Sequence, residues 1–125
     1  MISTLAQVAL GGAIGASLRY LSGVAAIRAM GPGFPWATLT VNIVGSLAMG
    51  LFAGFVANKG GQHLAPFVMT GLLGGFTTFS AFSLDTITLF ERGAMGQAAI
   101  YVLGSVCLSV LALFAGLLIS RGVFA

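Results

Sequence analysis

The sequence predicts an all-α membrane protein with four transmembrane helices. Of its 125 residues, 58% are hydrophobic and 6% carry a formal charge, whereas charged residues make up about 25% of an average soluble domain. The mean hydropathy is +1.10. Since a membrane-spanning helix needs about 20 apolar residues, the chain has room for four spans with short connectors and none for a soluble catalytic domain.

Charged residues and turn residues divide this single domain, residues 1–125, into its spans. The first span has no Lys or Arg before Arg19, so we expect a permanent helix rather than a cleavable signal peptide. Gly and Pro residues at 31–35 break the helix before the second span, and polar connectors follow the second and third spans. We expect the spans at about residues 3–27, 37–57, 66–90 and 94–120.

Glycines four residues apart predict close packing between the spans. The pairs are Gly11/Gly15 in the first span, Gly50/Gly54 in the second and Gly71/Gly75 in the third. Small residues at this spacing let membrane helices approach each other closely. For the first two pairs we expect ordinary helix packing and nothing more.

The third span contains a segment that is poor helix material. Gly74 and Gly75 are followed by Thr77 and Thr78, and two adjacent glycines disfavour the interior of a helix. We therefore predict that the third helix is broken near its middle. Irregular backbone at membrane depth occurs only where it is buried in protein or lines a cavity. Such a break frees carbonyls that can hold a cation and N–H groups that can face an anion.

Polar side chains inside the other spans mark candidate functional positions, because they are costly in lipid. Asn42 lies in the middle of the second span, where its amide either bonds a neighbouring helix or lines a polar path. Tyr101, Ser105 and Ser109 recur every four residues and so share one helix face. Their hydroxyls either line a path or bond to carbonyls of their own helix.

The composition of these groups indicates a small anion as the solute. Hydroxyls, an amide and aromatic ring edges all present positive ends, and Phe79 and Phe82 share a helix face. Such a lining holds no fixed countercharge that would trap the ion. No pair of carboxylates occurs within one span, and His63 stands alone in a connector. The sequence therefore predicts no enzyme, and its five cations are too few and scattered for nucleic-acid binding.

Lys and Arg residues are spread almost evenly over the two membrane sides. Lys59 and Arg121 fall on one side, and Arg28 and Arg92 on the other. The positive-inside rule therefore gives no strong orientation. Either a span boundary is misplaced, or the protein inserts in both orientations and assembles as an antiparallel dimer. Four small helices enclose little space alone, so an oligomer is expected from size.

Three motifs resemble the Fluc (CrcB) fluoride channels, and they occur in that family's order and spacing. They are residues 11–20 (GGAIGASLRY), 38–42 (TLTVN) and 71–83 (GLLGGFTTFSAFS). The resemblance extends over essentially the whole chain. It implies an antiparallel, dual-topology homodimer with two pores that passively exports toxic fluoride from the cytoplasm. It also implies a place in the plasma membrane, as a multi-pass protein of the bacterial inner membrane.

The resemblance also implies roles for individual residues. The ring edges of Phe79 and Phe82 would contact fluoride, and Asn42 would donate a hydrogen bond in the pore. A polar track beside the pore would be formed by Thr38, Ser80, Ser83, Tyr101, Ser105 and Ser109.

Three further positions of the family pattern are matched or altered here. A sodium ion at the dimer centre would be held by the backbone carbonyls of Gly74 and Thr77 from both subunits. Arg19 matches the family's first-span arginine, which either draws anions into a vestibule or holds a helix end. Asp85 stands where the family often has Glu, and the shorter side chain changes the reach of the carboxylate.

The main alternative function is a small multidrug-type, proton-coupled antiporter, which would also be a four-span, dual-topology dimer. Such a transporter depends on an acidic residue in its first span. The first span here has Arg19 and no acid, which argues against this alternative. A packing subunit without transport activity is a third possibility, but it would leave the hydroxyl and phenylalanine cluster without a purpose.

Overall fold

The computed structural model describes residues 1–124, and all its regular elements are helices. Four helical segments are long and apolar enough to cross a membrane: Ile2–Met30, Trp36–Lys59, Gln62–Glu91 and Met95–Phe124. The first three predicted spans lie inside these segments. The fourth helix begins one residue later than predicted, at residue 95, and ends four residues later, at residue 124.

Three of the spans are single helices, and the third consists of several elements. The single helices are α1 (Ile2–Met30), α2 (Trp36–Lys59) and α5 (Met95–Phe124). The third span begins with a 3-10 turn and a π-helix and continues with two α-helices. In chain order these are η1 (Gln62–Leu64), η2 (Pro66–Leu73), α3 (Gly74–Phe76) and α4 (Phe79–Glu91).

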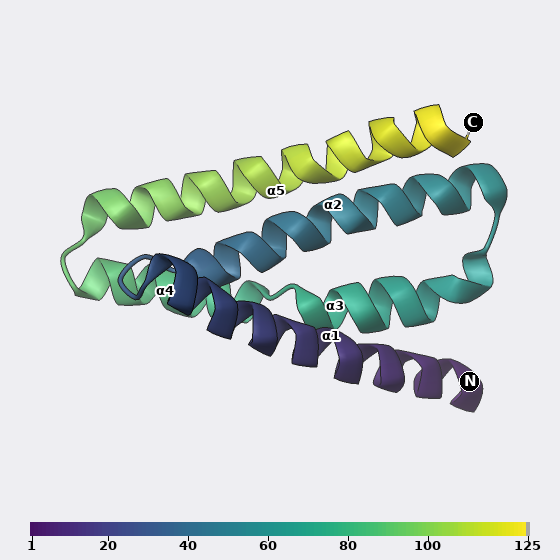
Figure 1. The fold of residues 1–125 in the computed structure, drawn as a ribbon, viewed down its shortest axis with the longest axis horizontal. Coiled ribbons are helices and arrows are strands. Elements are labelled where there is room, and N and C mark those ends of the chain that lie inside the picture. Colours follow the sequence, from purple (N-terminus) through teal and green to yellow (C-terminus); the bar gives the residue numbers. More distant parts are fainter. Residues whose placement is uncertain (125) are drawn as a thin grey trace.

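The helices run back and forth along one long axis (Figure 1). Both marked chain ends lie at one end of the molecule, together with the connection from α2 to the third span. The loop between α1 and α2 and the turn between α4 and α5 lie at the other end. Helix α2 has its most extensive contact with α5, and α1 packs mainly on η2 and α3.

Glycines allow both of these helix pairs to approach closely, as the spacing predicts. A methyl group added at Gly50 would collide with the carbonyl oxygen of Leu113 on α5, and one at Gly15 would collide with the carbonyl of Leu72. At Gly71 the added carbon would lie 2.8 Å from the carbonyl oxygen of Val8. The expectation of glycine-mediated packing is confirmed at these positions.

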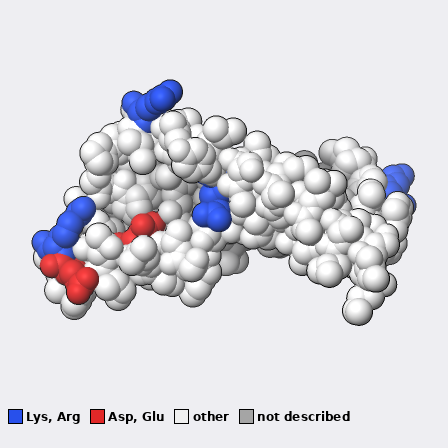
Figure 2. Space-filling view, turned by 90° about the horizontal axis from the view of Figure 1, so that it is seen from below, with Lys and Arg blue, Asp and Glu red and all other residues white. Residues whose placement is uncertain are grey.

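Most large apolar side chains of a single chain face outward, including many on α1 and α5. The fully buried side chains are few: Val41, Leu89, Tyr101 and Ser120. In a membrane this distribution is expected, since lipid solvates apolar surfaces. Figure 2 shows the charged groups toward the ends of the molecule, with one blue and one red group beside a hollow nearer its middle.

Two extended residues separate α3 from α4. Thr77 has φ −87° and ψ 159°, and Thr78 has φ −153° and ψ 119°. Helix α4 then starts at Phe79, and the Thr78 hydroxyl accepts a hydrogen bond from the Ala81 N–H at 3.1 Å. A threonine in this position satisfies one of the unpaired N–H groups of a helix start. This short extended segment, residues 77–78, interrupts the helical third span.

Candidate functional site

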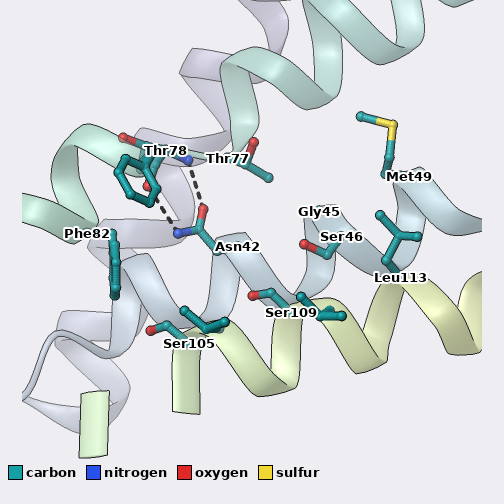
Figure 3. A pocket seen from close by; sticks show the side chains of 13 residues that line it. Asn42, Gly45, Ser46, Met49, Thr77, Thr78, Phe82, Ser105, Ser109 and Leu113 are labelled. Atoms are coloured by element: carbon teal, nitrogen blue, oxygen red, sulfur yellow. Dashed lines mark hydrogen bonds between the residues drawn. The ribbon is translucent and has the colours of Figure 1, made fainter. Parts of the chain in front are cut away.

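The extended segment is held by Asn42 of α2 through two hydrogen bonds (Figure 3). The Thr78 backbone N–H donates to Asn42 Oδ1 at 2.8 Å, and Asn42 Nδ2 donates to the Thr78 carbonyl at 3.1 Å. One amide side chain thereby satisfies both polar groups of a residue that lies outside a helix. Unpaired backbone groups are expensive at membrane depth, so Asn42 stabilises the extended conformation.

The carbonyls at the end of α3 are left without helical partners. In a continuous α-helix the Thr78 N–H would bond to the Gly74 carbonyl and the Ala81 N–H to the Thr77 carbonyl. Here these donors bond instead to Asn42 and to the Thr78 hydroxyl. The carbonyls of Gly74 and Thr77 therefore do not receive these two helical N–H groups. This donor chemistry suits a sodium ion, since unwound backbone carbonyls coordinate Na⁺ in membrane proteins.

Arg19 of α1 reaches the same helix end. Its Nε donates to the carbonyl of Gly75 at 3.1 Å, across 56 positions of sequence. The last carbonyls of a helix carry partial negative charge, which a cationic side chain stabilises. Arg19 therefore bonds directly to the end of α3. It also lines a cavity of about 500 Å³ together with Tyr20, Thr38 and Thr78.

A cavity of about 410 Å³ lies between α2, the extended segment and α5. Figure 3 shows residues of all three elements around it. The hydroxyls of Ser105 and Ser109 are buried there and have no hydrogen-bond partner among residues 1–124. Buried polar groups are normally paired, so these hydroxyls are available to a polar occupant of the cavity. The lining residues are Asn42, Gly45, Ser46, Met49, Thr77, Thr78, Phe79, Phe82, Ser105, Val106, Ser109, Val110 and Leu113.

The aromatic residues of the predicted site form a connected group. The ring centroids of Phe79 and Phe82 lie 5.5 Å apart, and those of Phe82 and Tyr101 lie 5.2 Å apart. Phe79 is 77% exposed in a single chain, whereas Tyr101 is fully buried. The Tyr101 hydroxyl donates to Asp85 Oδ2 at 3.0 Å. The carboxylate that the sequence left without a role thus bonds to a predicted track residue.

The residues predicted for the pore and its polar track fall into two groups. Asn42, Phe79, Phe82, Ser105 and Ser109 line the cavity together, and Thr38, Ser80, Ser83 and Tyr101 are not among its lining residues. The Ser83 hydroxyl donates to the Phe79 carbonyl of its own helix at 3.0 Å. The Ser80 hydroxyl lies 3.2 Å from that of Thr78.

Sequence reasoning missed Ser46 and Thr78 as lining residues. Ser46 lies four positions after Asn42 and therefore on the same face of α2. This four-residue spacing could have predicted Ser46 as a lining residue. The bonds between Asn42 and Thr78 had no such signal, because the two residues are 36 positions apart.

Comparison with known proteins assigns the chain to a family. The model of the CrcB-like protein, Camphor Resistance (CrcB) family matches residues 6–117. The chain belongs to the CrcB family. The matched range includes every residue of the cavity and the end of α3 with Arg19.

Curated CrcB relatives match the chain over nearly its whole length. One from Paracoccus denitrificans is 61% identical over 125 residues and covers 100% of both chains. One from a Ruegeria species is 62% identical over 124 residues, or 98% of each chain. One from Agrobacterium fabrum is 53% identical over 122 residues, or 96% of this chain and 98% of its own. All three are named fluoride-specific ion channel FluC.

Family membership and the four apolar helices agree on where the protein resides. The CrcB match extends through all four segments that are long and apolar enough to cross a membrane. The protein is a multi-pass protein of the bacterial inner membrane.

Proposed function

We propose that this protein is a fluoride-selective ion channel that passively exports toxic fluoride from the cytoplasm. The observation that carries the proposal is the cavity lined by Asn42, Ser105, Ser109 and the two phenylalanines. Its two buried serine hydroxyls have no partner within the described residues. The names of the full-length relatives support the choice of ion.

The chemistry of the lining suits a small, strongly hydrated anion. Fluoride must exchange its water for other hydrogen-bond donors as it passes. Two serine hydroxyls and the positive edges of Phe79 and Phe82 supply neutral donors along the cavity. Because no Lys or Arg lines this cavity, nothing in it binds an anion too tightly for release.

The dimer is part of the proposal. We expect two antiparallel copies, each inserted in the opposite orientation, to enclose two pores. The end of the molecule with both termini carries Lys59 and Arg121, and the other end carries Arg28 and Arg92. This even distribution gives neither orientation an advantage. A second copy would cover the outward apolar face and Phe79, which is 77% exposed in one chain.

The break in the third helix would contribute to both the fluoride pore and the sodium site. The start of α4, at Phe79, lies beside the cavity. The carbonyls of Gly74 and Thr77 would hold a structural sodium ion where the two copies meet. Hard carbonyl oxygens are suitable ligands, and within residues 1–124 no cluster of His, Cys, Asp or Glu offers a different metal site. The bound ion would neutralise partial charge and fix the break.

The antiporter alternative has less support. It needs an acidic residue in the first span, and α1 has none. The full-length relatives are named ion channels, and an ion channel is neither an enzyme nor an antiporter.

The test is ion efflux from liposomes that contain the purified protein. We expect rapid fluoride release that needs no proton gradient, and chloride release at the rate of protein-free liposomes. Equal rates for fluoride and chloride would contradict selectivity. Fluoride release at the protein-free rate, with the protein folded and inserted, would contradict the channel itself.

A further inference from the structure

An unbroken series of aromatic contacts connects the loop after α1 to the cavity. Phe34 lies in this loop, and its ring centroid is 4.7 Å from that of Trp36 and 5.6 Å from that of Tyr101. Tyr101 in turn contacts Phe82 at 5.2 Å, and Phe82 contacts Phe79 at 5.5 Å. Five rings therefore extend from Trp36, at the start of α2, to the cavity lining.

Within this series, the contact between Phe34 and Tyr101 is the one with an edge-to-face geometry. Their ring planes meet at 89°, edge to face, which is a favoured geometry for aromatic pairs. Phe34 also packs against the buried cluster of Leu89, Ala98 and Tyr101. A loop residue thus forms part of the wall that encloses a fully buried tyrosine.

The loop itself is anchored to the far end of the third span. Arg92 Nη2 donates to the Gly33 carbonyl at 3.0 Å, across 59 positions of sequence. Gly33 has φ +114°, a conformation that a residue with a side chain adopts rarely. The anchor and the turn together fix the backbone next to Phe34.

We propose that Phe34 is a positioning residue for fluoride permeation, which rests on the proposed channel function. Phe34 does not line the cavity. The Phe34 ring and the hydrogen bond from the Tyr101 hydroxyl to Asp85 together hold Tyr101 in one orientation. Tyr101 in turn supports the Phe82 ring, whose edge would face the ion. Without the Phe34 ring, Tyr101 gains space to rotate, and the Phe82 edge loses its fixed direction. A site that conducts by weak donors depends on such fixed geometry.

The first test measures Tyr101 directly, without any ion flux. The chain has two tyrosines, so isotope-labelled tyrosine gives two ring signals by NMR. Tyr20 is 71% exposed on α1 and serves as an internal reference. We expect Phe34→Leu to shift and broaden the Tyr101 signal, and Phe34→Tyr, which keeps a ring, to leave it in place. An unchanged Tyr101 signal in Phe34→Leu would overturn the proposal.

The second test measures fluoride efflux from liposomes with the same preparations. We expect about a tenfold loss for Phe34→Leu, the size that one lost edge-on ring contact permits, and recovery in Phe34→Tyr. The matched control is Phe55→Leu, since Phe55 also has an edge-on partner, Phe124, at 5.1 Å, but lies near the opposite end of the chain's second span. We expect neither a Tyr101 shift nor a flux loss there.

The outcomes separate this inference from the channel function. Wild-type protein that releases no fluoride contradicts the proposed function, while the Tyr101 signal still decides whether Phe34 positions that ring. A shifted Tyr101 signal with wild-type flux overturns the role in permeation. If Phe34→Leu does not assemble, Arg92→Met keeps the ring and removes the loop anchor. We then expect a smaller Tyr101 shift with a smaller flux loss, and wild-type values for both would overturn the proposal.

Discussion

Asn42 binds both backbone groups of Thr78, accepting from its N–H at 2.8 Å and donating to its carbonyl at 3.1 Å. The same side chain lines the cavity beside Ser105 and Ser109. The sequence left two alternatives open for this residue, a bond to a neighbouring helix or a polar path. The geometry combines them, because the bonded partner is itself part of the cavity wall.

Asn42→Ala removes both bonds and leaves the partly buried N–H and carbonyl of Thr78 without these partners. We expect a loss of roughly 1–3 kcal/mol in unfolding free energy, seen as a lower melting temperature in detergent, together with reduced fluoride efflux. The control is Asn58→Ala, because Asn58 Nδ2 bonds to the carbonyl of Gly54, one turn back on the same helix. Equal melting temperatures for the two variants would contradict the role of Asn42 at the extended segment.

Ser105→Ala and Ser109→Ala test whether the unpartnered hydroxyls serve the ion. Since these hydroxyls have no partner among residues 1–124, their removal should leave unfolding free energy within about 0.5 kcal/mol of wild type. Fluoride efflux should nevertheless fall. A loss of stability without a change in efflux would assign both serines to packing.

Ser120→Ala is the opposite case on the same helix. The Ser120 hydroxyl is fully buried and donates to the carbonyl of Leu51 at 2.8 Å. We expect this variant to lose about 1 kcal/mol of unfolding free energy and to keep wild-type efflux. Comparison of the two kinds of serine separates a structural hydroxyl from one that faces the ion.

Composition and turn residues were sufficient to predict the four spans. Lipid solvation requires long apolar segments, and Gly31–Pro35 and the charged connectors leave few choices for their ends. The glycine pairs were equally informative, because small residues at that spacing let membrane helices approach each other closely. These features depend on local sequence alone.

The direction of each hydroxyl was not predictable from the sequence. Ser83 and Ser105 are the same residue type within apolar helices, but Ser83 bonds to its own helix and Ser105 does not. The difference comes from neighbours that lie far away in sequence. The hydrogen bond between Tyr101 and Asp85 likewise joins α5 to α4. Although Asp has a shorter side chain than Glu, the Asp85 carboxylate still reaches the Tyr101 hydroxyl.

Phe79→Ile and Phe82→Ile test the ring edges. Both residues line the cavity with their rings 5.5 Å apart, and isoleucine keeps apolar bulk without a ring. We expect fluoride efflux to fall by about tenfold or more in each variant, equivalent to at least one lost interaction of about 1.4 kcal/mol. Size-exclusion chromatography should still show the wild-type assembly.

The matched control for the ring variants is Phe114→Ile. Phe114 is 52% exposed on α5 and is not among the cavity residues, so its replacement should leave efflux unchanged. Fluoride efflux at the wild-type rate in both Phe79→Ile and Phe82→Ile would remove the ring edges from the mechanism.

Gly75→Ala tests the packing that fixes the end of α3. A methyl group there would lie 2.9 Å from the Gly12 carbonyl oxygen and 3.2 Å from the Ala16 nitrogen. Both are backbone atoms of α1 and cannot rotate away, so α3 must move from α1. We expect a loss of roughly 1–3 kcal/mol in unfolding free energy, as overpacked cores show. The displaced carbonyls of Gly74 and Thr77 should also lose the proposed sodium ion.

The sodium effect is measured as the difference in thermal stability between sodium and potassium buffers. Wild-type protein should be more stable in sodium, and Gly75→Ala should lose that difference. Gly122→Ala is the control, since nothing lies within 4 Å of a methyl group at Gly122 and alanine favours a helix by up to about 1 kcal/mol. This control should keep the sodium effect. A Gly75→Ala variant with wild-type stability and the full sodium effect would show that the close contact of α1 and α3 does not fix the ion-binding carbonyls.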